Sequence, residues 1–135
     1  MIQKTKVIAY IFRRPEEILV FSHVDFPEVG LQVVGGTVEP QEDFQNALSR
    51  EILEESGLII HPHELNKIGE TIYKRRDREE INLRHYYSVI KTDLPDRWKH
   101  IVRSLGEDNG LVFEFFWVSL EEAKVVLDGN FAELL

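Results

Sequence analysis

Three glutamates lie close together on one predicted helix. At about 100° per residue, Glu54 and Glu55 both fall within about 60° of the direction of Glu51. Like charges at this spacing repel one another, and the negative end of the helix dipole makes their ionisation still less favourable. Carboxylate oxygens are the ligands that Mg²⁺ and Mn²⁺ prefer. The spacing therefore predicts that these three side chains bind Mg²⁺ or Mn²⁺.

The apolar residues of the same helix argue against a simple solvated acidic face. Phe44, Ala47, Leu48 and Leu58 fall in the same stripe as the glutamates. Acids that only solvate an exposed face should lie opposite these side chains, not in line with them. A partly exposed acidic patch near the helix end is the alternative, and the position of the acids favours a functional cluster.

Two consecutive glycines follow the apolar run of residues 31–34, which is expected to be a strand that ends at Gly35. Glycine lets the backbone approach a ligand closely, so the carbonyl oxygen of Gly35 can join the coordination shell of a metal. A Gly-Gly pair alone more often marks a tight bend. Together with the acidic helix, Gly35 and Gly36 predict a polyphosphate that is bound through a metal ion.

One mixed α/β domain, residues 1–135, is expected to position these residues, because no repeat or linker divides the chain. Pro40 suits the first position of the acidic helix and Gly57 suits its end, while Ser119 and Glu122 have the spacing that opens a second helix. The other strands are expected at residues 7–13, 17–24, 65–75, 82–90, 98–102 and 111–118.

The composition excludes several classes of protein. Apolar residues make up 43% and charged residues 30% of the chain, which is typical of a globular protein, and no cysteine is present to form a disulfide or a thiolate site. No apolar stretch approaches the roughly 20 residues of a membrane span, and the N-terminus lacks a signal-peptide layout, so we expect a cytoplasmic protein without membrane contact. The net charge of -8 argues against broad nucleic-acid binding.

Residues 36–58 resemble the Nudix box of the Nudix hydrolases at every defined position. The matching residues are Gly36, Glu42, Arg50, Glu51, Ile52, Glu54, Glu55, Gly57 and Leu58. The resemblance implies an α/β/α sandwich with a mixed β-sheet and Mg²⁺- or Mn²⁺-dependent hydrolysis of a nucleoside diphosphate linked to another group X. Water would attack one phosphorus, and the products would be a nucleoside monophosphate and phosphorylated X.

The resemblance also implies roles for individual residues. Glu51, Glu54 and Glu55 would bind the metal, with the Gly35 carbonyl as a fourth ligand. Arg50 would orient Glu51 or Glu54. Glu42 would support this arrangement, although a plain ion network within the helix is the alternative for Glu42.

The general base is left open, because members of the family differ in the carboxylate that takes the proton. Glu54 is the first choice and Glu51 the second. Candidates outside the box are Glu107, Asp108 and Glu114, and alternation along residues 111–118 places Glu114 on the outer side of a strand.

Other functions also stay open. A sensing module that binds a nucleotide without turnover is the second hypothesis, and the intact glutamate set argues against it. An isoprenoid-diphosphate isomerase is disfavoured because its chemistry needs a proton-transfer thiol or a comparable pair, and the chain has no cysteine.

The sequence does not identify X. It predicts a solvated loop rather than a phosphate contact at residues 75–80, and an exposed strand edge would permit a homodimer.

Overall fold

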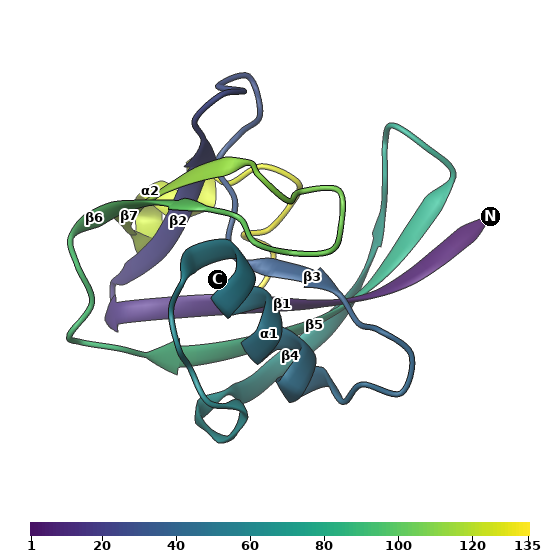
Figure 1. The fold of residues 1–135 in the computed structure, drawn as a ribbon, viewed down its shortest axis with the longest axis horizontal. Coiled ribbons are helices and arrows are strands. Elements are labelled where there is room, and N and C mark those ends of the chain that lie inside the picture. The colour runs from purple at the N-terminus through teal and green to yellow at the C-terminus, as the bar shows by residue number, and fades with distance from the viewer.

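The computed structural model describes residues 1–135 and contains one mixed sheet with two α-helices (Figure 1). The strands run in the order β4-β5-β1-β2-β7-β6, and the short strand β3 pairs with β1. The elements are β1 (Ile2–Arg14), β2 (Glu17–His23), β3 (Gly35–Thr37), α1 (Phe44–Ser56), the 3₁₀ turn η1 (Pro62–Glu64), β4 (Asn66–Lys74), β5 (Glu80–Ile90), β6 (Arg97–Ile101), β7 (Val112–Ser119) and α2 (Leu120–Val126).

Strand β1 is the centre of the fold because side chains on both of its faces are buried. Val7, Ala9 and Ile11 pack into a core cluster with α1, whereas Ile8 and Tyr10 pack into a second cluster with α2 and the C-terminal residues. Alternate side chains of a strand point to opposite faces, so the two clusters lie on opposite sides of the sheet. This arrangement agrees with the expected α/β/α sandwich.

Strand β1 pairs in parallel with β5 and antiparallel with β2 and β3. The N-terminal end of β1 and the turn between β4 and β5 extend together to one side of the molecule (Figure 1). Lys4 and Glu80 meet there, with 3.6 Å between Nζ and Oε1. This non-local pairing brings charged side chains from residues 4–6 and 75–80 together.

Helix α1 begins later than the sequence predicts. Asp43 is the N-cap, and its side chain accepts a hydrogen bond of 2.8 Å from the N–H of Asn46, so the expected start at Pro40 is wrong. Gln41 has φ of 65°, in the left-handed region, which is incompatible with a helix at this point. The expected end at Gly57 is confirmed: Gly57 has φ of 79° and its N–H donates to the Leu53 carbonyl.

The sequence predicts that the two glycines end a strand over residues 31–34, and this prediction is wrong. The glycines instead begin the short strand β3. Gly35 and Gly36 pair with Ile8 and Val7 in the ladder between β3 and β1, whereas Leu31 and Gln32 make only isolated bridges. A Cβ at Gly35 would lie 2.7 Å from the carbonyl oxygen of Val7. The missing side chain therefore allows β3 to approach β1.

The expected second helix is present, with Ser119 as its N-cap. Neither helix has the length and apolar character needed to cross a bilayer.

Candidate active site

Arg50 lies at the centre of the acidic cluster on α1. Its guanidinium donates two hydrogen bonds to Glu42, of 2.8 and 3.0 Å, one of 2.9 Å to Glu51 and one of 3.2 Å to an oxygen of Glu54. A further bond of 3.2 Å reaches the carbonyl of Thr37 on β3. Arg50 thus joins three box glutamates to the neighbouring strand through charge-assisted bonds.

The carboxylate of Glu51 sits directly over Gly36. A Cβ added at Gly36 would lie 2.1 Å from Cδ of Glu51, so only glycine leaves room for this side chain. Burial raises the pKa of Glu51 to about 7, Arg50 opposes that rise, and the charge of Glu54 adds to it. Glu51 therefore needs more positive charge than Arg50 supplies if it is to be fully ionised at neutral pH.

Glu55 is the most buried of the cluster, with 7% of its surface exposed. Burial raises the pKa of this carboxyl well above its usual value, and the charges of Glu51 and Asp108 add to the effect. The backbone N–H of Gly35 donates a hydrogen bond of 3.2 Å to its Oε1. The contact between Gly35 and the acidic helix is thus made by the N–H group, while the predicted role of the Gly35 carbonyl stays a prediction.

These residues fit a hard divalent cation by their chemistry. All of the candidate ligands are oxygens, and burial raises the pKa of both Glu51 and Glu55, so that a bound cation would favour their ionised forms. No three acidic or histidine side chains are arranged to hold a metal ion together. Arg50 engages Glu42, Glu51 and Glu54 in hydrogen bonds of its own. A metal would have to compete with Arg50 for Glu51 and Glu54.

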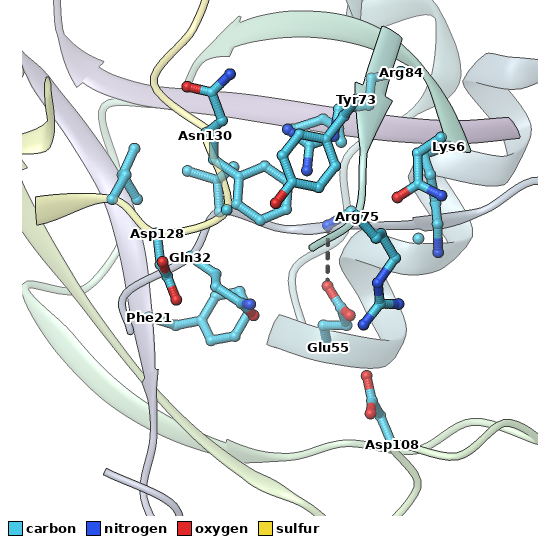
Figure 2. A pocket seen from close by; sticks show the side chains of 18 of the residues that line it. Lys6, Phe21, Gln32, Glu55, Tyr73, Arg75, Arg84, Asp108, Asp128 and Asn130 are labelled. Atoms are coloured by element: carbon cyan, nitrogen blue, oxygen red, sulfur yellow. Dashed lines mark hydrogen bonds between the residues drawn. The ribbon is translucent and has the colours of Figure 1, made fainter. Parts of the chain in front are cut away.

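Two adjoining cavities open on this cluster. The acidic cavity, of about 830 Å³, is lined by Glu51, Glu54, Glu55 and Arg50. The aromatic cavity, of about 680 Å³, is lined by Phe21 and Tyr73 (Figure 2) and by Phe131. The residues common to both linings are Lys6, Gly35, Gly36, Glu55, Arg75 and Asp108. A long ligand can therefore occupy both cavities at once.

The structure separates the three candidate bases that lie outside the box. Asp108 lines both cavities and lies on the same side of the aromatic cavity as Glu55 and Arg75 (Figure 2). Glu107 lines only the acidic cavity. Glu114 lines neither cavity, and it accepts a hydrogen bond of 2.8 Å from Arg97.

Four basic residues at the site are missed by the sequence motif. Lys4, Lys6, Arg75 and Arg78 all line the acidic cavity, although Arg75 and Arg78 lie at the predicted solvated loop. Lys4 and Lys6 share one face of β1 through simple alternation, and the parallel register with β5 brings them toward this loop. These four basic residues are separated in the sequence, so only the pairing of the strands shows that they lie at one site.

Comparisons with known proteins agree with this geometry. A sequence model described as NUDIX domain matches residues 3–134. A search of curated proteins finds no match.

Solved structures show the same fold. The Escherichia coli ORF135 protein is 24% identical, with a TM-score of 0.66 over 99% of this chain and 86% of that chain. A NUDIX hydrolase from Nitrosomonas europaea is 25% identical, with a TM-score of 0.65 over 92% and 77%. The NUDIX domain of Shewanella oneidensis NrtR, solved with ADP ribose, is 13% identical, with a TM-score of 0.72 over 99% and 84%.

The match over nearly the whole chain, together with the fold and the Arg50-centred glutamates, shows that this protein belongs to the Nudix family of hydrolases, which act on phosphoric anhydrides.

Proposed function

We propose that this protein hydrolyses the diphosphate linkage of a nucleoside diphosphate derivative and that Glu51, Glu54 and Glu55 hold the Mg²⁺ or Mn²⁺ it requires. The observation that carries the proposal is the continuity of the two cavities through Lys6, Arg75 and Glu55. Aromatic side chains suit the nucleoside, and carboxylates with nearby cations suit a metal-bound diphosphate. The substrate thus lies across the boundary between the cavities.

The metal, when bound, neutralises charge on the phosphate oxygens and lowers the pKa of the attacking water. Glu54 accepts the proton of that water, and Arg50 orients Glu54 through their hydrogen bond of 3.2 Å. The water oxygen bonds to one phosphorus while the bridging P–O bond breaks. The products are a nucleoside monophosphate and phosphorylated X.

Lys6 and Arg75, which line both cavities together with Glu55, bind the phosphate oxygens. Lys6 is held in place by a hydrogen bond of 2.7 Å from its Nζ to Oγ1 of Thr37 on β3. Arg75 is held by two hydrogen bonds to Asp77, of 2.8 and 2.7 Å. These cations offset phosphate charge in a protein whose net charge is -8.

The test is a phosphate-release assay with Mg²⁺ and Mn²⁺ on a panel of nucleotide derivatives. Glu54→Gln should fold and lose at least about a hundredfold in rate, as expected for loss of a base or a metal ligand. Glu121→Gln, which changes an exposed side chain on α2, is the matched control and should retain full activity. Equal rates for the wild type and Glu54→Gln would overturn the assignment of Glu54. In that case, a large loss in Asp108→Asn would move the base to Asp108.

A nucleotide-binding module without turnover is the second candidate function. The likeness to the NrtR domain that was solved with ADP ribose supports this alternative. Calorimetric binding of ADP-ribose without release of any product would favour the binding module over the hydrolase.

The outer edges of β4 and β6 are free for pairing with a second copy, so we also propose that a homodimer is accessible. Light scattering after gel filtration measures the molar mass and decides between the monomer and the dimer.

A further inference from the structure

An arginine is buried in the wall of the aromatic cavity. Arg84 on β5 has 3% of its surface exposed. Its guanidinium carbon lies 3.8 Å from the ring centroid of Tyr73 on β4 and 4.3 Å from that of Phe131 in the C-terminal segment. Arginine is seldom buried this deeply unless it is paired, and here it makes cation–π contacts with both rings.

One edge of the guanidinium is fixed by the protein itself. Nη1 of Arg84 donates to Oε2 of Glu133 at 3.1 Å and to the hydroxyl of Tyr86 at 3.2 Å. The same Glu133 oxygen also accepts hydrogen bonds from Thr71 and Tyr86. These contacts balance the charge of Arg84 and set the plane and direction of its guanidinium.

The opposite edge is left for a ligand. Nε and Nη2 of Arg84 donate no hydrogen bond within the protein. Neither nitrogen is fully buried, since the only fully buried side-chain nitrogen or oxygen without a hydrogen-bond partner is Oε1 of Glu80. Arg84 lines the aromatic cavity (Figure 2), and its Nε and Nη2 are the guanidinium nitrogens left to contact a ligand there. The cavity wall therefore presents two parallel N–H donors in a fixed orientation.

The position of Arg84 favours a nucleobase over a phosphate as the partner of these donors. Lys6 and Arg75 line both cavities, whereas Arg84 lines only the aromatic one and is already paired with Glu133. A phosphate bound at the glutamates would therefore be contacted by Lys6 and Arg75 and not by Arg84. The group that reaches Arg84 is the part of the nucleotide that enters among Phe21, Tyr73 and Phe131.

We propose that Arg84 reads the base of the substrate and selects a 6-oxopurine over adenine. Two parallel donors match the adjacent O6 and N7 acceptors of guanine or hypoxanthine. Adenine offers N7 as an acceptor but places an amino donor at position 6, which would face one of the N–H groups of Arg84. The inference rests on the proposed function, and it adds the class of base.

The first test uses the wild-type protein and matched substrate pairs. The values of kcat/KM for ITP and ATP, and for GDP-glucose and ADP-glucose, are measured with Mg²⁺. The 6-oxopurine of each pair should be preferred by about tenfold or more, which is the usual discrimination of a bidentate pair. The kcat/KM for GTP should also exceed that for 7-deaza-GTP, which lacks the N7 acceptor, by a similar factor. Equal values within these pairs would overturn the proposal.

Variants separate base reading from a purely structural role of Arg84. Arg84→Lys keeps a cation for Glu133 but loses the fork, so the preference should shrink toward unity through KM while kcat changes little. Arg97→Gln, paired with Glu114 outside both cavities, is the arginine control and should keep the preference. An unchanged preference in a folded Arg84→Lys would contradict the proposal.

Failure of this inference is distinguishable from failure of the proposed function. If the wild type hydrolyses nothing on the panel, calorimetric binding of GDP-glucose and ADP-glucose still measures base preference. Hydrolysis of both members of each pair at the same efficiency supports the hydrolase and rejects the role of Arg84.

Discussion

Replacement of Glu51 with Gln should stabilise the metal-free protein and at the same time remove its activity. Burial raises the pKa of Glu51 from 4.5 to about 7. At pH 8 without metal, Glu51 is ionised in both the folded and the unfolded state, but its ionisation costs more free energy in the folded state. One pKa unit corresponds to about 1.4 kcal/mol, so this ionisation lowers the free energy of unfolding by up to about 3 kcal/mol. Gln has nearly the same shape and carries no charge.

The sign of the effect can be checked by its pH dependence. Because the folded pKa is the higher one, the folded protein binds this proton more tightly between pH 4.5 and about pH 7. The stability contributed by protonated Glu51 is fully present below pH 4.5 and is lost as the pH rises through about 7. The variant should therefore match the wild type near pH 4 and exceed it at pH 8, by roughly 10 °C in Tm at most.

Urea unfolding in EDTA at both pH values measures this difference, with Glu121→Gln, at an exposed position of α2, as the control. Addition of Mg²⁺ at pH 8 should stabilise the wild type more than Glu51→Gln, because binding to the folded state raises its stability. If the variant proves no more stable than the wild type at pH 8 in EDTA, ionised Glu51 carries no cost, and the reasoning from its burial is refuted.

Changes at three further positions test the surroundings of the cluster. Arg50→Gln should lower the free energy of unfolding by about 2–4 kcal/mol in EDTA, since Glu42, Glu51 and Glu54 lose their shared cation. Arg50→Lys should lower the free energy of unfolding by a smaller amount, and urea unfolding measures both variants. Gln41→Gly should raise stability by about 0.5–1 kcal/mol without loss of activity, because it relieves a left-handed φ of 65°; a lower Tm would contradict this. The hydrogen bonds from Arg50 lower the pKa of Glu42, so its stabilising effect is present above pH 4.5 and is lost as the pH falls below it. An acid titration should be flatter for Glu42→Gln than for the wild type.

The local parts of the site are those that the sequence predicts well. The spacing of Glu51, Glu54 and Glu55 and the stop at Gly57 depend only on helical periodicity and on a left-handed cap, and both can be read along one segment. The start of α1 is wrong because Pro40 and Asp43 are both acceptable at a helix N-terminus, and the left-handed Gln41 decides between them.

The non-local parts of the site could not be predicted. Lys6 meets the glutamates only because β1 pairs with β3, and Arg84 acquires its aromatic partners only when β4 and the C-terminal segment close over it. No spacing in the sequence encodes these meetings. The sequence offers Asp108 only as one of three candidates outside the box, and it is the fold that places Asp108 in both cavities and Glu114 in neither.

The bare backbone beneath Glu51 has a consequence for inherited variation. Every missense change in the codon of Gly36 adds at least one carbon where the Glu51 carboxylate lies, 2.1 Å from its Cδ. In a saturation mutagenesis experiment scored by growth or turnover, position 36 should be as intolerant of substitution as Glu51, although the side chain of Gly36 is a single hydrogen atom.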